Sequence, residues 1–312
     1  MIQKECETLQ QAAVTLKKKK FRMKKEDWFS LFMLIPVIFN FLVFYCGVNF
    51  GSIMLAFTTT TPEGKQIFSL VHFQNFFKEL GRSDSAVYMA LFNTLEYYLL
   101  NQVKYAATII IAYFFYKKVY GHKIYKVLFF MPAMIPSMVF ISTFKNFIST
   151  YGPIDIVLQN LFGYKLPPLL AFPETAKGTI MFFHVWSGFG MQLLIQVGAM
   201  NRIPEEVIEA AKLDGCIGFK EFRYIVLPLI LETVLTYFLL GLTGIFEASG
   251  PFLFFVGELM PEVHTLGYWT FCQAMGGATN YPAAIGLFFT FVALPFVVIS
   301  RLGINKLDTV TY

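Results

Sequence analysis

The sequence has little charge and little cysteine. Only 14% of its 312 residues are charged, 56% are hydrophobic, and the mean hydropathy is +0.58. So large an apolar excess excludes an ordinary soluble domain, and it equally excludes a disordered or collagen-like chain. The 4 cysteines include no CxxC pair, which leaves a zinc site or a disulfide framework with little support.

Sequence motifs for ATP binding and for common catalytic sites are also missing. There is no GxxxxGK[ST] phosphate-binding loop, no HExxH, no Gly-x-Ser-x-Gly elbow, and no close carboxylate pair such as DxD at the end of an apolar run. We therefore expect no enzyme activity and no cofactor in this chain. Any ATP and magnesium that its function requires must be bound by another chain.

What the sequence does have is long apolar runs. A bilayer core about 30 Å thick needs roughly 20 apolar helical residues to span it, and the first run is too long for a cleaved signal peptide. The sequence therefore predicts an all-α membrane protein with about six transmembrane helices. They are expected at Phe29–Phe50, Tyr88–Phe115, Val127–Phe147, Thr179–Met200, Leu229–Ser249 and Tyr281–Ser300.

The distribution of positive charge predicts the orientation. If both termini are cytoplasmic, 18 of the 25 Lys and Arg residues lie on the cytoplasmic side, as the positive-inside rule requires. The lysine-rich stretch 17–25 then fixes topology and touches anionic headgroups, a simpler reading than a nucleic-acid arm. We expect a basic segment at 1–28, a membrane domain at 29–302 and a short tail at 303–312.

The segment 203–228, between the fourth and fifth predicted spans, predicts an exposed helix–turn–helix. Pro204 suits the first helical position, and the glutamates that follow are favoured by the helix dipole. Asp214-Gly215 is a turn or C-cap signal. Leu227-Pro228 marks the entry into the next span. A second short helix is indicated by apolar residues at spacings of three and four, namely Phe219, Phe222, Ile225 and Val226.

This segment also carries a recognisable signature. It reads Glu-Ala-Ala from Glu209, then three residues, Gly215, nine residues, Ile225, one residue and Leu227-Pro228, with Asp214 before the glycine. The chain resembles the permease subunits of binding-protein-dependent ABC importers, in the sugar and oligosaccharide (maltose-type) group. Weaker similarities to the same family lie at Asn93-Thr94, Phe130-Met131-Pro132 and Trp186–Gly190. One departure is Ser249-Gly250-Pro251, where the family commonly has Gly-Gly-Pro.

The resemblance implies a type I importer permease in a prokaryotic cell membrane. Its partners would be a second homologous permease, two ATPase subunits, an extracellular solute-binding protein and a carbohydrate. The segment 203–228 would be a coupling loop that docks on the ATPase, although an amphipathic helix on the membrane surface remains an alternative. The residues implied in coupling are Glu209, Ala210, Ala211, Asp214, Gly215, Ile225, Leu227 and Pro228.

Polar and aromatic residues within the spans are candidates for the solute path. Ionisable groups in a membrane are costly and usually face a cavity or the bundle interior, and sugars bind through aromatic rings and polar partners. The candidates are Glu96, His184, Trp186, Gln192, Phe246 and Glu247. Helix packing and interhelical hydrogen bonding are the alternative roles. Lys104 is expected to extend its side chain toward the cytoplasm.

Two other functions compete with an importer permease. An ion-coupled secondary transporter is conceivable, because Glu96 and Glu247 could carry protons. Uptake that is abolished by a protonophore and indifferent to ATP depletion would favour it. An intramembrane enzyme is the other competitor, but its catalytic constellation is missing from the sequence.

Overall fold

The computed structural model describes residues 25–60, 65–246, 255 and 260–307. Within these residues the chain is helical, apart from two three-residue strands, β1 (Thr58–Thr60) and β2 (Gln66–Phe68), that pair antiparallel. The predicted all-α class is confirmed. The chain divides into two compact units, Met1–Met54 and Leu55–Tyr312.

The first unit holds the first apolar helix. It consists of α2 (Lys25–Asn40), the π-helical η1 (Phe41–Gly47) and the first residues of α3 (Val48–Ala56). Large apolar side chains along it are exposed, among them Phe32, Phe39 and Phe44. Because the helix Phe32–Ala56 is long and apolar enough to cross a membrane, lipid or another apolar chain is the natural environment for them.

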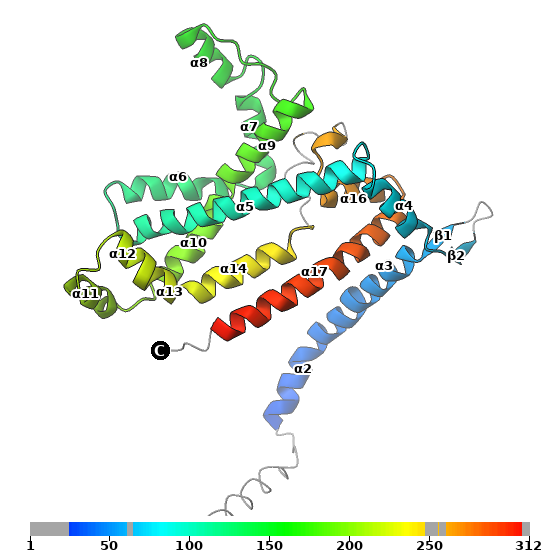
Figure 1. Ribbon diagram of the computed structural model, residues 1–312, viewed down its shortest axis with the longest axis horizontal. Coiled ribbons are helices and arrows are strands. Elements are labelled where there is room, and N and C mark those ends of the chain that lie inside the picture. Colours follow the sequence, from blue (N-terminus) through cyan, green and yellow to red (C-terminus); the bar gives the residue numbers. More distant parts are fainter. Residues whose placement is uncertain (1–24, 61–64, 247–254, 256–259, 308–312) are drawn as a thin grey trace, which may run out of the picture. The chain divides into compact units, whose positions relative to one another are not determined.

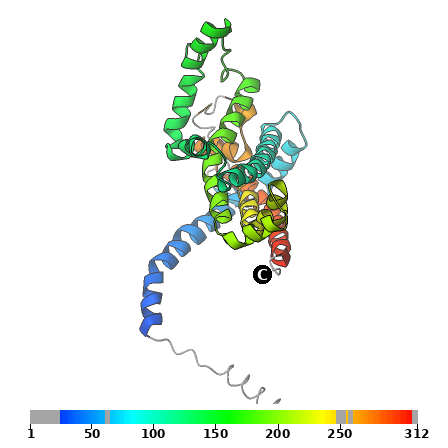
Figure 2. The same ribbon diagram turned by 90° about the vertical axis from the view of Figure 1, so that its left-hand side faces the viewer.

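The second unit is a bundle of helices (Figures 1 and 2). Its elements, in chain order after β2, are α4 (Val71–Leu80), α5 (Ala86–Tyr116), α6 (His122–Met134), α7 (Ser137–Phe147), α8 (Pro153–Phe162), α9 (Pro173–Ser187), α10 (Phe189–Met200), α11 (Glu205–Leu213), α12 (Phe219–Glu221), η2 (Phe222–Val226), α13 (Leu227–Leu229), α14 (Leu231–Thr243), η4 (Pro261–Val263), α16 (Leu266–Met275) and α17 (Asn280–Leu307).

The third predicted span is not one straight helix. In the structure α6 and α7 meet at an angle of 109°. The break falls at Ile135-Pro136, where both residues have extended backbone, because proline disfavours helical backbone in the residue before it. Figures 1 and 2 show α7 and α8 projecting away from the rest of the bundle. The prediction of a continuous helix at Val127–Phe147 is therefore wrong.

The fifth predicted span is bent as well. The helical stretch Phe219–Leu229 meets α14 at 69°, with the break at Ile230. Pro228 lies inside the first stretch, so the turn into the span comes after the proline and not at Leu227-Pro228. The end of this predicted span, residues 247–249, lies outside the described residues.

Span counting by length and composition gives three helices, or up to five if each bent pair crosses once. The three are Phe32–Ala56, Pro173–Met200, which joins α9 and α10, and Asn280–Gly303 within α17. Of the six expected spans, only α5 falls outside this count. At 31 residues it is about 46 Å long, but polar side chains interrupt its apolar character.

Helix α5 lies at the centre of the second unit, and three apolar clusters pack along it. Val87 and Ala90 belong to the cluster with α16 and α17, and Tyr97 to the cluster with α7 and α9. Tyr105 to Phe115 belong to the cluster with α10, α11 and η2. One helix therefore connects all three clusters, including the one beneath the α11–α13 segment.

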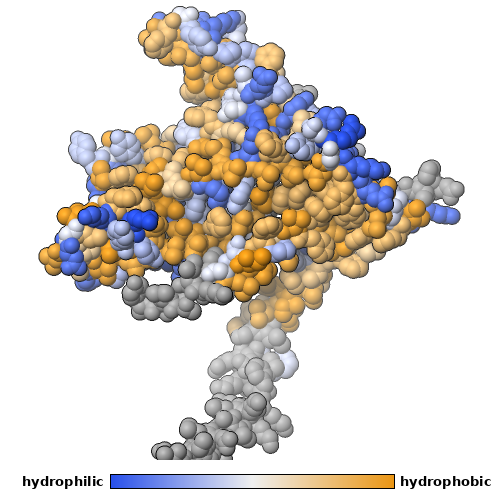
Figure 3. Space-filling model, viewed as in Figure 1, coloured by the Kyte–Doolittle hydropathy of each residue, from blue (hydrophilic) through white to orange (hydrophobic). Residues whose placement is uncertain are grey.

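Much of the bundle's surface is apolar. Figure 3 shows hydrophobic residues covering most of one face, and exposed large side chains include Leu99 and Val103 of α5, Leu194 of α10 and Phe291 of α17. Exposure of this extent is unfavourable in water, so lipid or partner helices must cover these faces.

Candidate functional site

The segment α11–α13 forms the predicted hairpin. Helix α11 begins at Glu205, one residue later than expected, with Pro204 in extended backbone at its N-cap. It ends in a Schellman motif, in which the Gly215 N–H donates to the Lys212 carbonyl at 3.0 Å and the Cys216 N–H to the Ala211 carbonyl at 2.8 Å. Gly215 has φ +75°, a conformation that glycine adopts without strain. The turn predicted at Asp214-Gly215 is present.

A second glycine completes the corner. Gly218 has φ +63° and ψ −122°, a region essentially restricted to glycine. A Cβ at either Gly215 or Gly218 would meet nothing within 4 Å. Backbone conformation, and not a lack of space, therefore calls for glycine at both positions.

The hairpin is fixed to the end of α5 by polar contacts. Lys117 donates from Nζ to both carboxylate oxygens of Glu221, at 2.8 and 2.9 Å. The Glu221 side chain is completely buried. The Tyr113 hydroxyl donates to the Gly218 carbonyl at 2.9 Å, and the Tyr113 ring packs on Phe222. Sequence reasoning missed these contacts, because pairing across about 100 residues leaves no local pattern.

The signature residues divide between two faces of the hairpin. Ala211 is buried, as is Ile208, which belongs to the apolar cluster that includes Tyr113. Ile225 and Leu227 are half-buried, whereas Glu209, Ala210, Asp214, Gly215 and Pro228 are exposed. Beside them Leu213, Ile217 and Phe219 are 89%, 65% and 74% exposed. A surface on which carboxylates border three solvent-exposed apolar side chains has the composition of a protein-docking surface.

Among the candidates for the solute path, Glu96 has a partner of opposite charge. It forms an ion pair with Lys177, which lies on α9, two residues before the start of the predicted fourth span. Lys177 also lies over the Phe92 ring. This ion pair joins α5 to α9.

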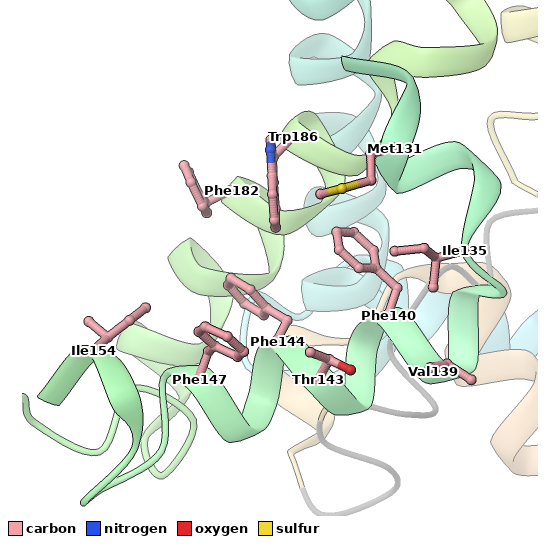
Figure 4. A pocket seen from close by; sticks show the side chains of 10 residues that line it. All are labelled: Met131, Ile135, Val139, Phe140, Thr143, Phe144, Phe147, Ile154, Phe182 and Trp186. Carbon is pink, nitrogen blue, oxygen red and sulfur yellow. The ribbon is translucent and has the colours of Figure 1, made fainter. Parts of the chain in front are cut away.

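His184 and Trp186 are close in sequence but face different neighbours. The His184 ring makes an edge contact with Tyr97 of α5. Trp186 packs on Phe140 and Phe144 of α7 and lines a pocket of about 470 Å³ between α6, α7, α8 and α9 (Figure 4). Thr143 is the one residue lining this pocket with a polar side-chain oxygen or nitrogen besides the indole. The pocket therefore suits an apolar group better than a sugar.

Gln192 lies in the bundle interior. It is within hydrogen-bonding reach of Tyr237 of α14, and Tyr237 stacks on Tyr105 of α5. One turn further along α10, the Gln196 amide donates to the Tyr105 hydroxyl at 2.7 Å, and that hydroxyl donates to the Val234 carbonyl at 3.1 Å. The amide oxygens of Gln192 and Gln196 are buried without a hydrogen-bond partner among the described residues.

The remaining candidates do not join this cluster. Phe246 packs on Phe289 of α17, and Glu247 lies outside the described residues. The six path candidates thus belong to different places in the bundle. Lys104 does not extend toward a helix end as expected: it is 95% buried at the junction of α9 and α10.

Exposed apolar helices, two bent helix pairs and an exposed hairpin are features of a membrane protein whose surface is left for lipid or other chains to cover. The family model described as the binding-protein-dependent transport system inner membrane component matches residues 105–309, and the chain belongs to this family. The expected resemblance is confirmed. Membership places the protein among prokaryotic inner-membrane transport permeases.

Sequence relatives are permeases for maltose and maltodextrin. The chain is 34% identical over 113 residues to MalF of Salmonella typhimurium and 33% identical over 113 residues to MalF of Escherichia coli K12. Each match covers 36% of this chain and 22% of the relative. The chain thus matches about a fifth of the length of these relatives.

Solved structures share the fold over nearly the whole chain. A bacterial ABC transporter involved in import of the acidic polysaccharide alginate aligns with a TM-score of 0.77 at 22% identity, covering 92% of this chain and 98% of that one. A bacterial alginate ABC transporter in complex with an alginate pentasaccharide-bound periplasmic protein gives a TM-score of 0.76 at 22% identity, with coverage of 88% and 93%.

Proposed function

We propose that this chain is the membrane-spanning permease subunit of an ATP-driven importer and forms part of the path for a carbohydrate. Family membership supports a transport role, and the α11–α13 hairpin supports the coupling role. The observation that carries the proposal is this hairpin: its corner is set by two glycines, its signature carboxylates are exposed, and its base is fixed to α5.

The partners follow from what the chain lacks. ATP and magnesium would be bound by two separate ATPase subunits, because the sequence has no phosphate-binding loop. A second homologous permease would cover the exposed apolar helices and complete an alternating-access pathway. An extracellular binding protein would deliver the solute, as the periplasmic protein in the related alginate complex suggests. Both termini would be cytoplasmic, on the side of the positive loops.

The hairpin has a direct mechanical route into the bundle. A partner that binds Leu213, Ile217 and Phe219 would move the corner as a unit, because the Schellman hydrogen bonds at Gly215 and Cys216 hold the turn together. Lys117 and Tyr113 would pass this displacement to α5. Since α5 joins all three apolar clusters, a shift there would repack the α9–α10 and α14 helices that line the path.

The substrate class rests on the relatives and on side-chain chemistry. MalF is a maltose and maltodextrin permease, and the structural relatives import alginate. Stacked tyrosines beside two buried glutamine amides provide the ring faces and hydrogen-bonding groups that sugars require. A carbohydrate is therefore the solute we propose.

The proposal is tested by asking whether changes in the hairpin uncouple ATP hydrolysis from solute uptake. Co-purification with this chain should yield an ATPase and a second permease, and the assembly can be reconstituted in proteoliposomes. In the Glu209→Lys and Gly215→Asp variants we expect the permease to insert and ATP to be hydrolysed while solute uptake is lost. Glu174→Lys, a charge reversal at the exposed start of α9, is the matched control. Normal uptake in both hairpin variants would refute docking at this loop.

A further inference from the structure

Lys104 is a buried cation in the middle of the bundle. It is 5% exposed and lies about 27 Å from the start of α5 and about 18 Å from its end. A lysine side chain is too short to bring its ammonium to either end from there. A charge at this depth is costly, and such groups usually pair with an opposite charge or with backbone carbonyls.

The ammonium occupies a space left by a glycine. A Cβ at Gly188, between α9 and α10, would lie 2.4 Å from the Lys104 Nζ and 2.8 Å from the His184 carbonyl oxygen. Any larger residue at 188 would displace the lysine. The junction between the two helices is thus shaped around this ammonium group.

The described residues place no carboxylate against Lys104. Glu96 is two turns away on the same helix, about 12 Å along its axis, and is paired with Lys177. Glu221, the buried carboxylate of α12, is paired with Lys117 at the end of α5. Lys104 therefore has no carboxylate partner among the described residues.

Groups that recognise hydroxyls lie next to this cation. Gln192 follows Gly188 by one turn of α10, and Gln196, one turn further, bonds to Tyr105, the residue after Lys104. Both glutamines are more than nine-tenths buried, and the part of the chain that the structure describes supplies no hydrogen-bond partner for either amide oxygen. A cation that needs a carboxylate, beside acceptors that need hydroxyl donors, matches a sugar that carries both groups.

We propose that Lys104 binds a carboxylate of the transported solute, so that the solute is an oligosaccharide of acidic sugars. This rests on the proposed function and narrows its substrate class. His184, Gln192 and Gln196 flank the cation and contact the sugar's hydroxyls when the bundle opens around the α9–α10 junction. Lys104 is then a specificity-determining residue, because a neutral sugar would leave its charge unpaired.

The experiment measures solute-stimulated ATP hydrolysis by the co-purified assembly in proteoliposomes. The probes are trigalacturonate, which is acidic, and maltotriose, which is neutral. We expect trigalacturonate to stimulate hydrolysis more strongly, and Lys104→Gln to raise the concentration needed for half-stimulation about tenfold or more. Lys104→Arg should retain most of the response. The matched control is Lys123→Gln, which removes an exposed lysine at the start of α6.

Other outcomes separate this proposal from the one it rests on. Stimulation by maltotriose alone, or a response to both sugars that Lys104→Gln leaves unchanged, would overturn the acidic substrate and leave the importer intact. A lack of stimulation by either sugar would count against carbohydrate import itself. If Lys104→Gln fails to assemble and adding Glu247→Gln restores assembly and activity, Glu247 is the counter-ion and the proposal is wrong.

Discussion

Lys117 and Glu221 are 104 residues apart in the chain and meet in a bidentate ion pair at 2.8 and 2.9 Å. Glu221 is fully buried, whereas Lys117 keeps about a quarter of its side chain exposed. Removing one member of a buried pair leaves an uncompensated charge and costs about 3–5 kcal/mol. This contact fixes the α11–α13 hairpin, the proposed coupling loop, to α5.

Breaking this pair should uncouple the transporter. We expect Lys117→Ala or Glu221→Ala to lower solute uptake per ATP hydrolysed at least severalfold and to lower the assembly's melting temperature. The double charge reversal, Lys117→Glu with Glu221→Lys, should recover much of both. Lys220→Ala, an exposed neighbour, is the control. If either single variant transports with normal stoichiometry, the ion pair does not carry the coupling.

Gly218 gives a second test of the hairpin. Its backbone conformation costs other residues about 1–3 kcal/mol, and the space around it is open. Gly218→Ala should therefore weaken ATPase retention on the permease without affecting insertion. Gly198→Ala, in α10 and equally open, should do neither. Retention can be measured by co-purification at increasing salt. Equal retention for the two variants would contradict the requirement for glycine at position 218.

Variants of the Glu96–Lys177 pair test whether Glu96 balances the charge of Lys177 or contacts the solute. Both side chains are about one-third exposed, so the pair adds little stability. If Glu96 only balances Lys177, Glu96→Gln should reduce uptake and the double variant with Lys177→Gln should restore it. A double variant that stays defective would indicate that Glu96 contacts the solute. In all variants uptake should stop on ATP depletion and withstand a protonophore.

Asp155 predicts a pH-dependent stability of the α7–α8 region. Its carboxylate accepts from the backbone N–H of Leu166, from the Gln159 amide and from the N–H of Tyr151, and these bonds lower its pKa from the ordinary 3.8. Because the folded pKa is the lower one, the stabilisation is fully present above pH about 4 and is lost as pH falls through the folded value.

Asp155→Asn should remove this dependence, since an amide has one acceptor oxygen and its NH₂ would face a donor. We expect faster limited proteolysis near residue 151 at neutral pH, where Tyr151 holds a left-handed backbone with φ +67°. Glu174→Gln is the control. Proteolysis at the wild-type rate would show that the three hydrogen bonds do not hold this turn.

Local backbone preferences made the hairpin predictable from the sequence. Contacts between residues far apart in the chain could not be predicted in this way. Asp214-Gly215 and the signature around it specify a turn through their own backbone preferences, and the structure has that turn. Pro136 also signals the bend at Ile135-Pro136 in the sequence. A span prediction from average hydropathy misses the bend, because the average does not register a single proline. The pairs Lys117–Glu221 and Glu96–Lys177 depend on which helices lie side by side. A single sequence gives no measure of that adjacency.

The π-helical turn η2 sets the direction in which the hairpin points. The Leu227 N–H bonds to the carbonyl of Phe222, five residues back, so this turn holds one residue more than an α-turn. Each residue of an α-helix rotates the chain by about 100°. Deleting a single residue within Phe222–Val226 would swing the whole docking corner by roughly a quarter of a revolution, with every side chain of that corner unchanged. The direction in which the proposed docking corner points can thus vary independently of the side chains that the corner carries.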